Sequence, residues 1–343
     1  METTIIGAVC HINLNYQLMK EAGITWLRHP FTYPFEEDGV TLREQYLRQK
    51  EEARHLIENG FKLLGTTFGI GSYRYIPEEK VTRWSNGTPA YVGKWNEERY
   101  YENCAKAAAF MAEDLKDLIT WWQISNEPDI ETFHGDMTEP QIERFLNVVA
   151  RGLKKGNPSA QPGTNLAGIS PFALELARHL CTGDDPAFEY IGIDGYLGSW
   201  SEGGPDEWRT RLDVLWSAAR KPIIVIEWGY ATLESGPNPD PEHKRFYNQD
   251  VCKNKTWGKH QHWDNKPHSN ETQAEFIMQT MKIFHDHPAV IGEFFLRWSD
   301  TETCWQCGDP LCPSECAWGI VDVNGRPKAG YYALKAAYEK YYQ

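Results

Sequence analysis

Short apolar runs alternate with amphipathic stretches along the whole chain. Such runs are typical of strands buried on both faces of a parallel sheet. They predict eight strands, at 4–9, 25–28, 61–68, 118–124, within 163–169, 190–196, 222–227 and 290–298. Stretches with helical periodicity lie between them, at 16–22, 42–58, 96–115, 138–155, 205–219, 271–285 and 329–341. This alternation predicts βαβ units.

The fold class that follows is α/β, a (β/α)8 TIM barrel with long loops after strands 3, 7 and 8. Such barrels typically take about 250 residues and can exceed about 400 with insertions. The chain of 343 residues therefore fits a single catalytic domain spanning residues 1–343. Two helix boundaries are well marked: Asn59-Gly60 ends the second helix, and Thr138 caps the helix that has Pro140 in its first turn.

Composition narrows the classes of partner. Hydrophobic residues make up 41% of the chain and charged residues 24%, as in ordinary globular proteins. The net charge of −13 disfavours binding to nucleic acid or to anionic membrane surfaces. No apolar run reaches the ~18 residues that a membrane span needs. Met1-Glu2-Thr3-Thr4 is acidic and runs straight into a strand, unlike a secretory signal, so we expect a cytoplasmic protein, or a secreted one if a leader was removed.

Two carboxylates stand where buried strands end. The apolar run 118–124 is followed by Ser125-Asn126-Glu127, and Pro128 stops further pairing. The run 222–226 ends in the same way at Glu227. In an α/β barrel the strand ends are where chemistry takes place. Two such glutamates, each near tryptophans, indicate acid/base and nucleophilic work on a sugar.

Further residues at strand ends accompany this pair: Arg28 on strand two, Tyr196 on strand six and Trp298 on strand eight. Together with Asn126-Glu127-Pro128 and Glu227, in this order, they resemble the clan A glycoside hydrolases, a superfamily of retaining (β/α)8-barrel glycosidases. The resemblance covers the whole barrel and does not single out one family. It implies that Glu127 is the acid/base and Glu227 the nucleophile.

The same resemblance implies roles for the neighbours. Arg28 would contact the nucleophile and keep it ionised, and Tyr196 would be the aromatic partner on strand six. Asn126 would bond the sugar 2-hydroxyl, and Trp298 would be the platform under the sugar. Structural alternatives exist for each: a satisfied strand-end carboxylate, an ion pair, a turn cap or a packed ring. His29, next to Arg28, fits a pocket position or a core position equally well.

Aromatic residues make up 13% of the chain and include 14 tryptophans, most of which core packing explains. The segment 69–95 is long for a loop and rich in rings, so it needs a purpose. We expect Trp84 and Trp95 in this segment to contact substrate.

Four cysteines, Cys304, Cys307, Cys312 and Cys316, follow strand eight closely. Their spacing suits a tetrahedral structural zinc; two disulfides, in a secreted protein, or four thiols are the alternatives. The other cysteines are scattered one to an element, as in a reducing compartment: Cys10, Cys104, Cys181 and Cys252. The insertion 230–268 also contains Cys252, His260 and His262. A second metal site there is an alternative, but solvated loop histidines are the better interpretation.

The sequence thus predicts a retaining β-glycoside hydrolase that cleaves a β-linked oligo- or polysaccharide by double displacement, with no cofactor for catalysis. A transglycosylase would use the same covalent intermediate. A non-catalytic carbohydrate-binding barrel would have lost one carboxylate, and a metal-dependent hydrolase would need a histidine cluster at the strand ends. The sugar, the linkage, endo or exo action and the oligomeric state stay open.

Overall fold

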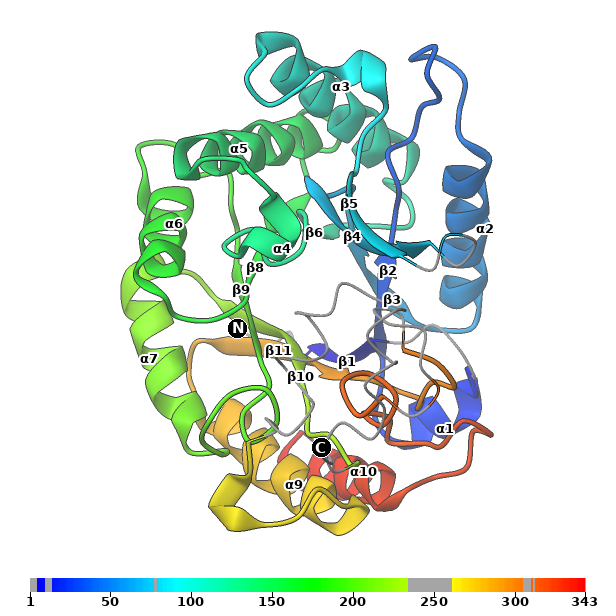
Figure 1. The fold of residues 1–343 in the computed structure, drawn as a ribbon, viewed down its shortest axis with the longest axis vertical. Coiled ribbons are helices and arrows are strands. Elements are labelled where there is room, and N and C mark those ends of the chain that lie inside the picture. Colours follow the sequence, from blue (N-terminus) through cyan, green and yellow to red (C-terminus); the bar gives the residue numbers. More distant parts are fainter. Residues whose placement is uncertain are drawn as a thin grey trace.

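The computed structural model describes residues 5–9, 14–76, 79, 81–233, 261–304, 310 and 312–342. Parallel strands form a barrel in the order β7-β6-β3-β2-β1-β11-β10-β9-β8 (Figure 1). They are β1 (Ile5–Val9), β2 (Trp26–Pro30), β3 (Lys62–Thr66), β6 (Trp121–Gln123), β7 (Gln161–Gly163), β8 (Asn165–Leu166), β9 (Ile191–Gly195), β10 (Ile223–Trp228) and β11 (Val290–Leu296).

The barrel closes through one short segment. β7 pairs with β6, β8 pairs with β9, and only Thr164 separates β7 from β8. Residues 161–166 therefore occupy the fifth of eight strand positions, and the predicted (β/α)8 barrel is confirmed.

Helices surround the barrel (Figure 1). They are α1 (Tyr16–Glu21), α2 (Glu44–Glu58), α3 (Glu98–Asp114), α5 (Glu139–Gly156), α6 (Pro171–Thr182), α7 (Glu207–Ala219), α9 (Asn270–Asp286) and α10 (Ala329–Tyr341). The predicted cap at Thr138 is confirmed, because it forms a capping box with Gln141. α6, which begins after a Ser170 cap, was not among the predicted helices. In the described ranges no helix is both long and apolar enough to cross a bilayer.

The buried residues form two clusters. The smaller cluster contains residues from several strands, including Val9, Trp26, Leu64 and Phe294. The larger cluster joins strand residues with residues of the surrounding helices. Side chains two positions apart on a strand share a face. Arg28 therefore follows Trp26 on one face of β2.

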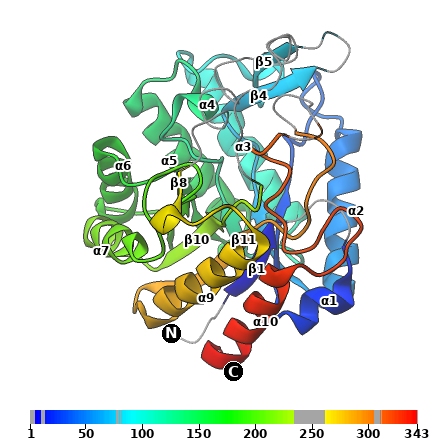
Figure 2. The same ribbon diagram turned by 60° about the horizontal axis from the view of Figure 1, so that its bottom comes forward.

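The long segment after β3, which was predicted to be a loop, contains regular structure. It contains an antiparallel hairpin of β4 (Gly71–Ile76) and β5 (Val81–Asn86), followed by the short helix η1 (Ala90–Val92). A further short helix, α4 (Glu131–His134), follows β6, and η3 (Trp263–Asn265) precedes α9. Figure 2 shows the hairpin near α4, at the other side of the view from α9 and α10.

Candidate active site

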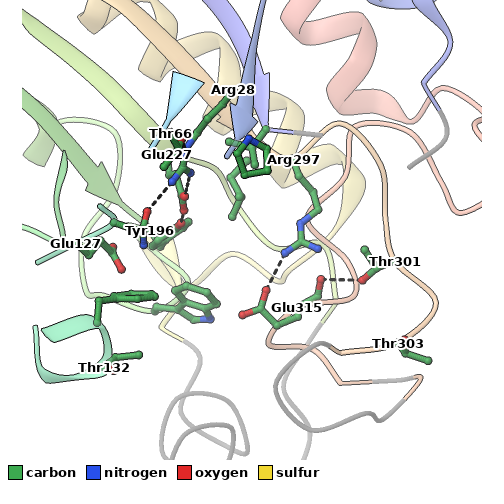
Figure 3. Close-up of a pocket in the computed structure, with 16 residues that line it drawn as sticks. Arg28, Thr66, Glu127, Thr132, Tyr196, Glu227, Arg297, Thr301, Thr303 and Glu315 are labelled. Carbon is green, nitrogen blue, oxygen red and sulfur yellow. Dashed lines mark hydrogen bonds and ion pairs between the residues drawn. The ribbon is translucent and has the colours of Figure 1, made fainter. Parts of the chain in front are cut away.

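A cavity of about 540 Å³ opens where the barrel strands end. Its wall includes the ends of β1, β2, β3, β10 and β11 and the residues directly after β6 and β9 (Figure 3). The lining residues are Val9, Arg28, Pro30, Thr66, Asn126, Glu127, Thr132, Phe133, Tyr196, Trp200, Glu227, Leu296, Arg297, Thr301, Thr303 and Glu315.

Glu227 is held by two donors in this cavity. Arg28 forms an ion pair with its Oε1, and the Tyr196 hydroxyl donates to its Oε2 (Figure 3). The side chains of Arg28 and Glu227 are 11% and 14% exposed. Burial and the charge of Glu227 raise the pKa of Tyr196 well above its ordinary value, so the phenol keeps the proton that it donates. Both oxygens of Glu227 are thus held by donors, one of them a cation.

Arg28 also organises its other neighbours. Its Nη2 donates to Asn126 Oδ1 at 2.6 Å, and its Nε donates to Thr66 Oγ1 at 3.3 Å. Burial acts to lower the pKa of Arg28, but the charges of Glu227 and Asp194 raise it overall. The guanidinium therefore stays charged and connects the ends of three barrel strands.

Glu127 lines the same cavity from the loop after β6. Its backbone adopts a left-handed conformation with φ of 38°, and Ser125 has φ of 61°. The Glu127 N–H donates to Asn165 Oδ1 at 3.2 Å. Two residues later, Asp129 anchors the same segment: its Oδ1 accepts a hydrogen bond from the Ala167 N–H at 2.9 Å. Burial raises the pKa of Asp129 to about 6.

A layer of fully buried polar side chains lies behind the lining residues. Gln123, Asn165 and Asp194 are each 0% exposed and are joined by hydrogen bonds through Asn165. Burial, together with the charges of Glu227 and Glu127, raises the pKa of Asp194 well above its ordinary value. None of these three residues lines the cavity.

A second ion pair forms another part of the wall, as Figure 3 shows. Arg297 Nη2 donates to Glu315 Oε2 at 2.8 Å, and the Thr301 hydroxyl donates to the Glu315 carbonyl at 3.3 Å. The Trp200 ring lies 4.4 Å from that of Tyr196, measured between centroids. Trp200 and Glu315 were not among the predicted site residues, because they follow the strands at a distance and carry no strand-end signal.

Trp298 was predicted to lie under the sugar, but the structure places its ring in the core. β11 ends at Leu296, which lines the cavity. Trp298 is 0% exposed, its backbone N–H donates to the Val9 carbonyl, and its ring packs against Tyr331. A ring without accessible surface offers no platform for a ligand.

Trp84 and Trp95 do not reach the cavity either. Their rings pack edge to face with centroids 6.0 Å apart, and neither lines the cavity. His29 is buried, with its Nε2 2.8 Å from the Gln49 carbonyl oxygen, and is absent from the cavity wall. Of the predicted site residues, the cavity thus unites Arg28, Asn126, Glu127, Tyr196 and Glu227.

The zinc prediction receives no support from the part of the chain that the structure describes. Cys304, Cys312 and Cys316 are buried, but no group of three or more metal-ligating side chains occurs among the described residues. Cys307, Cys252 and His260 lie outside these residues. Metal analysis of purified protein checks the prediction, which requires about one zinc per chain.

No family model matches the chain. Among curated proteins, it is 20% identical over 342 residues to a β-xylosidase of Caldicellulosiruptor saccharolyticus. The alignment covers 95% of this chain and 62% of that protein, so the chain spans less than two thirds of its relative.

Solved structures share the fold. A family 39 glycoside hydrolase from Bacteroides cellulosilyticus WH2 aligns with a TM-score of 0.61 at 14% identity, over 97% of this chain and 62% of that one. The GH53 catalytic domain of Ignisphaera aggregans gives a TM-score of 0.63 at 20% identity, over 98% and 91%. A glucosidase from Croceicoccus marinus gives 0.64 at 13% identity, over 98% and 67%. The predicted resemblance to glycoside hydrolases is confirmed by these relatives.

Proposed function

We propose that this protein is a retaining β-glycoside hydrolase, with Glu227 as nucleophile and Glu127 as acid/base. The observation that carries the proposal is one cavity in which Glu227 is fixed by Arg28 and Tyr196 while Glu127 lines the same wall. Retaining glycosidases need such a pair, one carboxylate kept ionised and the other able to exchange a proton.

The reaction runs in two displacements. Glu227 attacks the anomeric carbon as the bond to the leaving oxygen breaks, and Glu127 gives its proton to that oxygen. Water then attacks the glycosyl-enzyme, Glu127 takes a proton from the water, and Glu227 departs as carboxylate. The charge on Arg28 and the Tyr196 hydroxyl stabilise Glu227 whenever it is ionised.

Asn126 is placed to bind the sugar. Its Oδ1 already accepts hydrogen bonds from Arg28 and Asn165, at 2.6 Å and 3.0 Å. Its Nδ2 is therefore the atom left to donate to the 2-hydroxyl, a contact that strengthens in the transition state. The Arg297–Glu315 pair lies at the same cavity, where a charged pair can offer both a donor and an acceptor to other hydroxyls.

The proposed substrate class is a β-linked oligo- or polysaccharide. β-Xylosides are the first to test, because the curated protein with which the chain aligns is a β-xylosidase. The test uses aryl and alkyl β-glycosides of xylose, glucose and other common sugars with wild type, Glu227→Ala and Glu127→Ala. Glu227→Ala should lose turnover on every substrate. Glu127→Ala should fail on alkyl glycosides but still release an activated phenol, and azide should restore its turnover, because a strong nucleophile needs no base.

Stereochemistry decides the mechanism. Proton NMR of the earliest wild-type product should show the β-anomer, and the azide product of Glu127→Ala should also be β. An initial α-sugar from a β-glycoside contradicts the retaining mechanism and the role of Glu227. A wild-type enzyme that hydrolyses no glycoside in the panel contradicts the proposed function itself.

A further inference from the structure

Asn165 stands at the centre of the buried polar layer, on the short strand β8. Its Nδ2 donates to Asn126 Oδ1 at 3.0 Å and to Asp194 Oδ2 at 2.6 Å. Its Oδ1 accepts from Gln123 Nε2 at 2.7 Å and from the Glu127 N–H at 3.2 Å. A side-chain amide has two donor hydrogens and two acceptor lone pairs. All four are used, in a side chain that is 0% exposed.

Two of these bonds reach the catalytic segment directly. Glu127 has a left-handed backbone with φ of 38°, and left-handed conformations cost an L-residue about 1–2 kcal/mol. Such a conformation persists only where surrounding structure holds it. The bond from the Glu127 N–H to Asn165 is such a restraint, and it fixes the direction from which the Glu127 side chain enters the cavity.

The second contact with this segment is to Asn126, whose amide could face either way. Because Asn165 Nδ2 and Arg28 Nη2 both donate to one atom of Asn126, that atom must be the oxygen. Asp194 accepts the second Asn165 proton and thereby fixes the orientation of Asn165 itself. Arg28 and Asn165 thus together determine which atom Asn126 presents to the cavity, and Asn165 is the one of the two that does not itself line it.

We propose that Asn165 is a positioning residue for both members of the Asn126-Glu127 pair: its oxygen aims the acid/base and its nitrogen orients the sugar-binding amide. Asn165 touches no substrate, since it does not line the cavity. The inference rests on the proposed glycosidase function. The alternative hypothesis is that Asn165 has a purely structural role. Its loss would then lower stability and would slow the reaction equally for good and poor leaving groups.

The two sides of the amide can be removed separately. Asn165→Ala removes both sides. Asn165→Asp has nearly the same shape and keeps an oxygen for the Glu127 N–H. Its carboxyl lies beside that of Asp194, so the one proton that the two share lies between them and none is left for Asn126. The matched control is Thr164→Val, because Thr164 is also fully buried and donates one hydrogen bond, to the Ile124 carbonyl at 2.8 Å. It removes a bond of the same segment that reaches neither Asn126 nor Glu127.

The measurement is kcat/KM on a dinitrophenyl and a methyl β-glycoside of the sugar that wild type accepts. Asn165→Ala should lose about 100-fold on the methyl glycoside, as misplaced catalytic groups do. It should lose less than about tenfold on the dinitrophenyl glycoside, which needs little acid catalysis. Asn165→Asp should lose equally on both, and its loss should shrink on a 2-deoxy substrate, because only the contact to the 2-hydroxyl is impaired. Thr164→Val should keep wild-type ratios.

Three outcomes separate the possibilities. If Asn165→Ala lowers the melting temperature but loses equally on both leaving groups, as Thr164→Val would, the amide is structural and the inference is wrong. If Asn165→Ala does not fold, the 2-deoxy comparison with Asn165→Asp still decides, and an unchanged loss there overturns the inference. If wild type is inactive on every glycoside, the proposed function fails first, and that result is visible without any variant.

Discussion

Trp200 and Trp298 have the same side chain in opposite environments. Trp200 lines the cavity beside Tyr196, whereas Trp298 is fully buried against Tyr331. Trp200→Ala should therefore lower kcat/KM about tenfold, equal to about 1.4 kcal/mol, and should lower stability less than Trp298→Ala, because its ring is only partly buried, against Tyr196 and Trp318. Trp298→Ala should lower the free energy of unfolding by about 3–5 kcal/mol. Steady-state kinetics and urea unfolding of both variants check this; a kinetic defect confined to Trp298→Ala would contradict it.

Glu293 makes the stability of the protein depend on pH. It is 1% exposed, the Trp228 indole N–H donates to its Oε2, and burial raises its pKa to about 8. In the unfolded chain a glutamate has a pKa of about 4.3. Between these values the folded state binds a proton that the unfolded state has lost. The free energy of unfolding should therefore fall as pH rises, by up to about 1.4 kcal/mol per pH unit, and level off above about pH 8.

Glu293→Gln tests this dependence, because glutamine has no proton to lose and keeps an oxygen for Trp228. Its free energy of unfolding, from urea titrations at about pH 5 and about pH 9, should fall less with pH than that of wild type. Glu293→Gln should be the more stable of the two proteins, relative to their difference at about pH 5, at about pH 9. A constant difference between the two proteins at both pH values would show that Glu293 does not titrate in this range.

At the scale of elements, α4 connects the hairpin to the cavity. Thr132 and Phe133 of α4 line the cavity, and Gly135, directly after it, lies against the hairpin residue Trp84. Gly135 has φ of +61°, and an added Cβ would lie 2.8 Å from Trp84 Cζ2. Gly135→Ala should therefore lower stability by about 1–2 kcal/mol and also lower kcat/KM, because α4 must shift.

Gly168→Ala is the matched control, since an added Cβ there meets nothing within 4 Å. Its stability and kinetics should stay at wild-type values. If Gly135→Ala loses stability but keeps wild-type kinetics, the hairpin supports the fold and does not position α4 for the reaction.

The elements differ in how far sequence could reveal them. The barrel strands were predictable because two-sided burial requires continuous apolar runs, although β6 is shorter than its run and ends at Gln123. The hairpin β4–β5 was missed, since the alternation of Tyr73 and Tyr75 with polar residues was attributed to a loop for ligands. The α6 helix was missed although Ser170 and Pro171 form a capping signal.

On the scale of the whole molecule, the barrel joins distant parts of the chain. β1 pairs with β11 along all its residues, from Ile5–Gly292 to Val9–Leu296. No segment of such a barrel can keep its partners when another opens, so we expect one cooperative unfolding transition, as a single domain requires. Calorimetric and van't Hoff enthalpies should agree. Two separate transitions would contradict the single-domain prediction.

The closed barrel also explains which site residues could be predicted from the sequence. Arg28, Glu127 and Glu227 were predictable, because a parallel barrel brings every strand end to one rim. Arg297 and Glu315 were not, since their pairing depends on the path of the chain after β11. Trp298 was misplaced because the apolar run continues beyond Leu296, where the strand itself ends.

The left-handed backbone at Glu127 has a consequence for preparative chemistry. Glycine adopts a φ of 38° without the penalty that alanine meets there, although it gains more freedom in the unfolded chain. Glu127→Gly should thus melt higher than Glu127→Ala, by up to about 1 kcal/mol in stability. A variant without the acid/base can still be charged by an activated donor and then discharged by azide, yet has lost the base that activates water. The glycine form would therefore be the more durable catalyst for making β-glycosyl azides, which parallel melting curves and product yields over repeated cycles would establish.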